Sequence, residues 1–384
     1  MTETPLARAL REHIAAGRPL MDLTASNPTH CGFTYDAERL LSPLADVAAM
    51  SYEPIPRGML SAREAVCRYY ADLNIQLKPS QIFLTTSTSE AYSFLFRLLC
   101  DSGDEVLIAQ PSYPLFDFLA TLDDVRLVPY SLVYDHGWQI DVASLHGQIT
   151  ARTRAIVVVN PNNPTGHYTK PWERAELEEL CREFSLALIA DEVFLDYPLD
   201  RSSEAGNFSF ASGAATVPTF VLSGLSKVAG LPQMKAAWIA CLGPKEERRQ
   251  AEARLEIVAD TFLSMNAPIQ YALPSWLGSR QGIQREIGER VRENLAVLDE
   301  LLSRNSLVSR LEVEAGWYVV VRIPAVKGDD ETALELLNRG VSVHPGYYFG
   351  LPGAGWLVVS LLCTKQMFYD GMERVLRLVQ ERNQ

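Results

Sequence analysis

Short apolar runs alternate with helix-like segments from about residue 60 to residue 245. Apolar runs of this length, bounded by polar or turn residues, are typical of buried strands. The runs lie at 81–85, 105–109, 155–159, 186–190, 219–222 and 236–240. Between two of them, residues 172–184 carry apolar side chains at helical spacing. This alternation predicts an α/β domain with a mostly parallel sheet.

The pattern changes in the last hundred residues. Residues 283–305 carry many charges at helical spacing and predict one long helix that links two domains. After it, two strand-like stretches flank a short helical segment, and a final helix closes the chain; these lie at 313–324, 331–340, 355–363 and 365–383. Strands and helices in this order predict a small α+β domain.

We therefore divide the chain of 384 residues into three parts. They are an N-terminal arm that joins the small domain (1–45), a large cofactor-binding α/β domain (46–280), and the linking helix with the small C-terminal domain (281–384). Two domains also agree with a soft expectation of about 150 residues per domain.

Composition and charge narrow the class of protein. Apolar residues make up 47% and charged residues 21%, as in ordinary globular enzymes. The net charge of −12 disfavours nucleic acid and anionic membrane surfaces as partners. No stretch approaches the roughly 18 apolar residues of a membrane helix, and the N-terminus lacks an apolar targeting segment. Six scattered cysteines without a C-x-x-C pair fit a reducing cytoplasm, and we expect no metal site.

Polar residues follow the predicted strands, at the edge where open α/β sheets bind ligands. After the first strand, Ser87 and Glu90 have the spacing of a helix capping box. The same helix N-terminus, with free N–H groups and hydroxyls, could equally hold a phosphate. After the second strand, Tyr113 stands between two prolines, where it could stack on a flat ring or simply form a turn.

The next two strands lead to more specific motifs. The loop 160–166 reads NPNNPTG, and its prolines and glycine would hold Asn163 rigidly against a ligand. Asp191 ends a buried strand, where a carboxylate needs a cationic or hydrogen-bonding partner because burial without one costs several kcal/mol.

Lys227 is the one lysine of seven that closely follows a buried strand and lies among small residues. Desolvation can remove its proton, and a neutral amine can attack an aldehyde. A phosphate site, a stacking aromatic ring, an amide, a carboxylate and an amine are the groups that pyridoxal 5′-phosphate requires. The sequence therefore predicts this cofactor.

Several motifs carry a resemblance over nearly the whole chain: SNPT at 26–29, Tyr52 through PRG to AREA at 52–65, TSTSEA, PSYP, NPNNPTG, DEVF, SGLSK-x-x-GLPQMK and HPGYYFG at 344–350. The chain resembles the class I/II pyridoxal-phosphate-dependent aminotransferases, which are aspartate-aminotransferase-like enzymes of fold type I. The resemblance implies a large, mostly parallel seven-stranded α/β domain with a small α+β domain. It also implies that the enzyme moves an amino group between two substrates. One is an amino donor, expected to be an amino acid, and the other is a 2-oxo acid.

The resemblance also implies roles for individual residues. Ser87, Thr88, Ser89 and Ser226 would contact the phosphate, Tyr113 would stack on the ring, Asn163 would meet O3′, and Asp191 would pair with the pyridine nitrogen. Lys227 would be the Schiff-base lysine and the proton shuttle. Tyr52 would reach the phosphate of the neighbouring subunit, which implies a homodimer.

Three positions depart from the family pattern. Lys235 stands where the family usually has an arginine that clamps the phosphate, so the charge is kept and the bidentate fork is lost. Phe194 replaces a tyrosine whose hydroxyl would bond O3′. Val358 replaces the arginine that commonly grips the substrate α-carboxylate, and valine cannot bind a carboxylate.

Other residues must then hold the substrate. Arg57 follows the segment that begins at Tyr52, and Arg322 shares a strand face with Tyr318 in the small domain. Arg57 would approach from the neighbouring subunit and could instead serve the dimer contact or the phosphate, and Arg322 could be a solvated strand end. Asn27, within the SNPT motif, is a third candidate.

Two other functions remain open on the motifs. A pyridoxal lyase or decarboxylase of the same fold would use the same cofactor residues. A non-catalytic pyridoxal-binding sensor would need a basic DNA-binding extension, which the acidic chain does not suggest.

Overall fold

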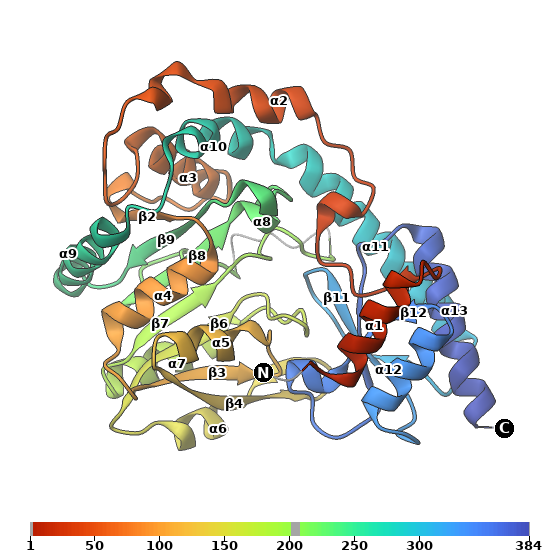
Figure 1. Cartoon of the computed structure of the whole chain (residues 1–384). Helices are drawn as coiled ribbons and strands as arrows, with labels where there is room; N and C mark the ends of the chain where they lie inside the picture. Colours follow the sequence, from red (N-terminus) through yellow and green to blue (C-terminus); the bar gives the residue numbers. More distant parts are fainter. Residues whose placement is uncertain (1–2, 201–207, 384) are drawn as a thin grey trace.

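The computed structural model describes residues 3–200 and 208–383. Residues 1–2 of the predicted N-terminal arm, residues 201–207 of the predicted large domain and residue 384 of the predicted C-terminal domain therefore lie outside the described residues. A large body surrounds one sheet, and a smaller body contains both the first and the last helix of the chain (Figure 1). Segments from the two ends of the sequence therefore lie together.

The large body contains an eight-stranded sheet in the order β2-β9-β8-β7-β6-β3-β4-β5. Its strands are β2 (Ile82–Thr85), β3 (Glu105–Gln110), β4 (Arg126–Tyr134), β5 (Trp138–Ile140), β6 (Thr153–Val159), β7 (Ala187–Asp191), β8 (Thr219–Gly224) and β9 (Ala237–Leu242). Only β5 and β9 run against the others. The large, mostly parallel sheet is confirmed, with one strand more than the seven that the resemblance implied.

All six strands expected from apolar runs are present, and the two additional strands lie at one edge. In β4, buried and exposed residues alternate, and Pro129 interrupts the run, so it lacks the continuous apolar pattern of the central strands. The three-residue β5 then pairs antiparallel with β4 and extends the edge. Edge strands need no buried second face, which explains their weaker sequence signal.

Helices cover both faces of the sheet. On one face lie α4 (Thr88–Leu99), α5 (Leu115–Leu122) and α9 (Lys245–Phe262), and on the other lie α3 (Leu60–Asp72), α6 (Val142–Gln148), α7 (Pro171–Glu183) and α10 (Ala267–Ser279). Central strands are thus buried on both faces, which explains their continuous apolar runs. Within the described ranges, no helix has the length and apolar character needed to cross a membrane.

The small body is built from an antiparallel sheet in the order β10-β11-β14-β13 and a two-stranded parallel pair, β1 with β12. Its strands are β1 (Met21–Asp22), β10 (Ser309–Arg310), β11 (Tyr318–Arg322), β12 (Val341–Ser342), β13 (His344–Pro345) and β14 (Trp356–Ser360). Its helices are α1 (Pro5–Ala15), α12 (Asp329–Asn338) and α13 (Lys365–Arg382). The pairing of β1 with β12 places the start of the chain in this body (Figure 1).

Two segments join the bodies. After β1 the chain crosses to α2 (Ala37–Leu41), where the backbone oxygen of Leu40 accepts a hydrogen bond from Trp276 of α10 at 2.8 Å. The long helix α11 (Gln281–Ser303) hydrogen-bonds the large body through Gln284 and the small body through Asn294. A cavity between two bodies held in this way has walls from both.

Candidate active site

A cavity of about 910 Å³ opens at the carboxyl edge of the central strands. The side chains of the sequence prediction that line it are Asn27, Ser87, Thr88, Ser89, Tyr113, Asn163, Asp191, Phe194, Ser226, Lys227 and Lys235. The large sheet places most of these residues, because they directly follow β2, β3, β6, β7 and β8. The predicted convergence of strand-end residues is therefore present in the structure.

One end of the cavity can hold an anion. Ser87 caps α4, and its Oγ accepts a hydrogen bond from the backbone N–H of Glu90 at 3.1 Å, so its own hydroxyl proton is free to donate. Thr88 and Ser89 form the first turn of α4, where the helix dipole favours negative charge. Lys235 adds a positive charge on the same cavity wall. The Ser87 cap and the predicted phosphate site thus share one helix N-terminus, although the capping box is incomplete because the Glu90 carboxylate accepts from the Thr86 N–H and not from that of Ser87.

Asp191 lies at the floor of the cavity and is 7% exposed. Its Oδ2 accepts a hydrogen bond from the Tyr92 hydroxyl at 3.1 Å, and its Oδ1 accepts one from the Val193 N–H at 3.2 Å. Burial raises the pKa of this carboxyl to about 6, although these hydrogen bonds and Lys227 favour the ionised form. A cationic ring nitrogen would supply the partner that the carboxylate lacks.

Lys227 extends from the short helix α8 (Leu225–Val228) into the same cavity. Its Nζ donates to the backbone oxygen of Ser26 at 3.2 Å and lies 4.5 Å from the Trp317 ring and 5.3 Å from the Phe194 ring. Burial lowers the pKa of the amine to about 8, against the opposing attraction of Asp191. The lowered pKa therefore increases the unprotonated, nucleophilic share of this amine near neutral pH relative to an exposed lysine.

The donor set fits pyridoxal phosphate. Asn163 is 8% exposed, lines the cavity, and its Oδ1 has no hydrogen-bond partner among the described residues. The amide oxygen can accept from a ligand that reaches it, and the amide N–H₂ of the same side chain can donate to a ligand oxygen such as O3′. With the anion site, Asp191 and Lys227, the cavity offers each polar contact that this cofactor requires.

The departures from the family pattern have different surroundings. Phe194 is 4% exposed, lines the cavity, and packs edge-on against Trp317, so no hydroxyl is available at this position. Val358 is fully buried in the core of the small body and does not line the cavity. No arginine of the described residues lines the cavity.

Two predicted substrate residues, Arg57 and Arg322, do not line this cavity. Arg57 is bound to Glu256, with its Nη2 2.8 Å from Oε2, and its guanidinium lies over the Phe83 ring. Arg322 is exposed and packs over the Trp356 ring. Arg322 shares a strand face with Tyr318, but it lies about 13 Å further along the strand, and only Tyr318 lines the cavity.

Tyr52 lies outside the main cavity. It is 81% exposed and lines a second cavity of about 370 Å³ beside α10. Asn27 does line the main cavity, where its Oδ1 accepts from both the N–H and the hydroxyl of Thr29.

Sequence reasoning missed several lining residues. Tyr92, Tyr318, His344 and Tyr348 all line the cavity. Tyr92 lies at an apolar position of a helix, where the pattern predicts only core packing. His344 and Tyr348 lie in the HPGYYFG motif, which was a signal for the site, but the motif alone assigned them no role.

Comparisons with known proteins agree with this geometry. The family model for aminotransferases of class I and II matches residues 21–375. An alanine aminotransferase of Mycobacterium tuberculosis is 30% identical over 375 residues, covering 94% of this chain and 86% of that protein. A glutamate-pyruvate aminotransferase of Escherichia coli is 28% identical over 356 residues, covering 91% and 87%.

The solved structures show the fold. An alanine aminotransferase from Pyrococcus furiosus superposes with a TM-score of 0.87 at 24% identity, covering 98% of this chain and 96% of that one. The relatives favour transamination over the lyase, decarboxylase and sensor alternatives. The chain belongs to the class I and II aminotransferases, and it is a pyridoxal-phosphate-dependent enzyme that moves an amino group between an amino donor and a 2-oxo acid.

Proposed function

We propose that Lys227 is the lysine that carries the cofactor and moves the reacting proton. The observation that supports this proposal most directly is that Lys227 lines the same cavity as Asp191 and that burial lowers the pKa of its amine to about 8. When bound, pyridoxal phosphate supplies an aldehyde that takes up the amino group and a cationic ring that delocalises the electron pair left at the α-carbon. Lys227 Nζ would take the proton from the α-carbon of the amino donor, and later deliver a proton to the α-carbon of the new amino acid that forms from the 2-oxo acid.

The other residues orient the cofactor. We propose that Ser87, Thr88, Ser89, Ser226 and Lys235 hold the phosphate, that Tyr113 stacks on the ring, and that Asn163 donates to O3′. Asp191 keeps the proton on the ring nitrogen, because a carboxylate in a buried site strongly favours a cationic partner. Tyr92 positions Asp191 through its hydrogen bond.

The substrates we propose are α-amino acids such as alanine and glutamate with their 2-oxo acids, since two relatives carry these names. Without an arginine on the described cavity wall, the carboxylate would be held by neutral donors. Asn27 and the Tyr318 hydroxyl face the cavity from the small-body side and are the donors we propose.

A panel of amino donors and 2-oxo acids tests this function on the purified, cofactor-loaded enzyme. We expect amino-acid-dependent formation of the new amino acid, without matching release of ammonia or carbon dioxide. Release of either in proportion to donor consumption would contradict transamination. The Lys227→Ala variant is the control for cofactor-only chemistry.

We also propose a cytoplasmic homodimer. All six cysteines are free, as expected in a reducing compartment. Val47, Met50 and Tyr52 are each more than 80% exposed, and such apolar exposure is typical of surfaces that a partner covers. In a homodimer Tyr52 would reach the partner's phosphate. Sedimentation should give a dimer, and Tyr52→Phe should weaken cofactor binding; a monomer with full activity would contradict the proposal.

A further inference from the structure

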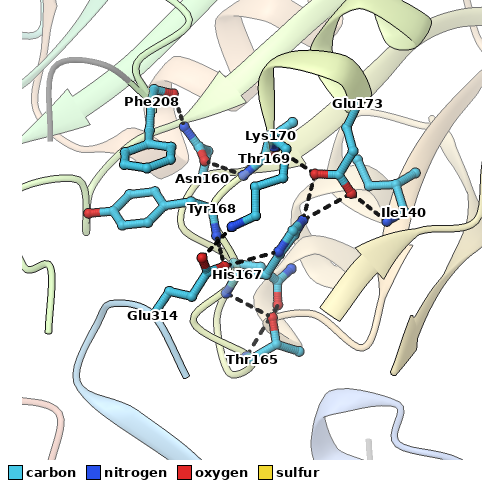
Figure 2. Close-up of polar contacts among 11 residues, drawn as sticks. Ile140, Asn160, Thr165, His167, Tyr168, Thr169, Lys170, Glu173, Phe208 and Glu314 are labelled. Carbon is cyan, nitrogen blue, oxygen red and sulfur yellow. Dashed lines mark hydrogen bonds and ion pairs between the residues drawn. The ribbon is translucent and has the colours of Figure 1, made fainter. Parts of the chain in front are cut away.

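His167, four residues after Asn163 in the chain, lies between two carboxylates (Figure 2). His167 is 2% exposed, and its Nε2 lies 2.9 Å and 3.1 Å from the two oxygens of Glu173. Its Nδ1 lies 3.3 Å from Glu314 Oε2, an ion-pair distance without hydrogen-bond alignment. Glu173 lies in the first turn of α7 in the large body, whereas Glu314 belongs to the segment that enters β11 of the small body.

The charge state of His167 follows from these contacts. A neutral imidazole can donate from only one ring nitrogen, whereas both nitrogens here face a carboxylate. Lys170 is the other charged group at the cluster, and it pairs with Glu314 Oε1. Burial alone would lower the pKa of His167, but Glu173 and Glu314 outweigh burial and raise it. The positive imidazolium matches the two negative charges around it.

Both carboxylates are held by backbone groups as well. Glu173 accepts from the N–H of Ile140 at 2.7 Å and of Lys170 at 2.6 Å. Glu314 Oε2 accepts from the N–H of Tyr168 at 3.2 Å. The carboxylates therefore keep their places relative to the loop, and His167 completes the bridge between them.

This bridge joins two segments that form the active site. On one side, residues 160–170 include Asn163, and on the other, Glu314 leads to Trp317, whose ring lies against Lys227 Nζ. Next to the bridge, the N–H of Ala315 donates to the Gly166 oxygen at 3.1 Å. Gly166 has φ +70°, and a Cβ there would lie 2.4 Å from the Ala315 oxygen, so the two segments are in direct contact.

We propose that His167 is a positioning residue that, in its protonated form, holds the Asn163 loop and the Glu314 segment together and so sets the geometry of the cofactor and substrate site. Its effect on the reaction rests on the proposed place of Asn163 beside the cofactor. Its effect on the folded chain does not depend on that function.

The stability of the full chain without cofactor tests the bridge alone. Because folding raises the pKa of His167, its charge stabilises the fold fully at low pH, and this contribution is lost as pH rises through the raised pKa. We expect His167→Asn to be most destabilised relative to wild type near pH 6. As pH rises through the raised pKa of His167, the difference in stability between the variant and the wild type should shrink, by about tenfold in the unfolding constant for each unit by which folding raises that pKa.

His136→Asn is the matched control. His136 is exposed and has φ 50°, a conformation that asparagine tolerates, so this variant should follow the wild type at every pH. Glu314→Gln is a second, milder variant, because the Glu314 side chain is 43% exposed. It should reproduce part of the same pH dependence even if His167→Asn folds poorly.

The loaded enzyme provides the second measurement. In His167→Asn we expect KM for the amino donor to rise at least about threefold while kcat changes less, together with a changed pKa of the bound cofactor's visible absorbance. A His167→Asn variant with the wild-type pH dependence of stability would overturn the bridge. If stability changes as expected but KM and absorbance do not, the bridge does not position the site, and the proposal fails for the reaction.

Discussion

The two walls of the cavity differ in charge. The wall from the large sheet carries two lysines, Asp191 and a row of hydroxyls, whereas the small-body wall carries Tyr318, His344 and Tyr348. Burial lowers the pKa of His344, so this imidazole is neutral near pH 7. The groups that a cofactor phosphate and ring require are thus confined to one wall, and the other wall offers only uncharged donors.

This difference separates two functions. Under the proposed function, charged groups on the large-sheet wall would bind the cofactor and move protons, and we expect their loss to reduce the chemical step itself. Neutral groups on the small-body wall would select the substrate, and single hydrogen bonds to a carboxylate contribute far less. Substitutions on the two walls should therefore differ by orders of magnitude.

Lys227→Ala should have the largest effect, lowering kcat by at least about 1000-fold because the reacting proton loses its acceptor. Borohydride reduction and peptide mapping of the wild type should place the pyridoxyl group on Lys227. An adduct on Lys235 would move the chemistry to a different lysine.

Asp191→Asn should come next, with kcat lowered by about 100-fold because an amide does not hold the ring proton. The measurement is single-turnover absorbance at saturating cofactor. Asp196→Asn is a control, since Asp196 is half-buried and accepts a hydrogen bond from the Tyr69 hydroxyl outside the cavity. Equal losses in both variants would indicate a general effect on folding.

Tyr318→Phe tests the neutral wall. We expect kcat/KM for the best amino donor to fall by about tenfold, through loss of one hydrogen bond to a carboxylate. Cofactor absorbance should not change. An unchanged kcat/KM would exclude Tyr318 as a carboxylate donor.

Phe194→Tyr should restore a hydroxyl near the ring. We expect the pKa of the bound cofactor's visible absorbance to fall by about one unit, because a hydroxyl would bond the ionised O3′. Spectrophotometric titration measures this. The absence of a downward shift would show that Phe194 points its ring edge away from that oxygen.

Arg322→Ala should have the smallest effect. Because Arg322 is exposed over Trp356 and outside the cavity, we expect kcat/KM to stay within about twofold of wild type. A tenfold loss would mean that the small body moves to bring this strand end to the substrate.

The sequence alone determined most of the large-sheet wall. Asn163, Asp191 and Lys227 each follow a buried strand within a few residues, and parallel strands bring their carboxyl ends to one edge. The sequence of strands and helices along the chain is therefore enough to predict that these three side chains lie close together. The alternating, proline-containing β4 gave no comparable signal, because its outward-facing residues are exposed and only one of its faces is buried.

Only the tertiary structure decided the rest. Whether an arginine reaches the cavity depends on its position along a strand and on the residues with which it forms ion pairs. Arg57, for example, pairs with Glu256, which is distant in the sequence. His167 lies between Glu173, six residues away, and Glu314, 147 residues away, and no local pattern encodes the second contact. Such contacts arise from the packing of two bodies, so the charge and role of His167 follow from the folded chain.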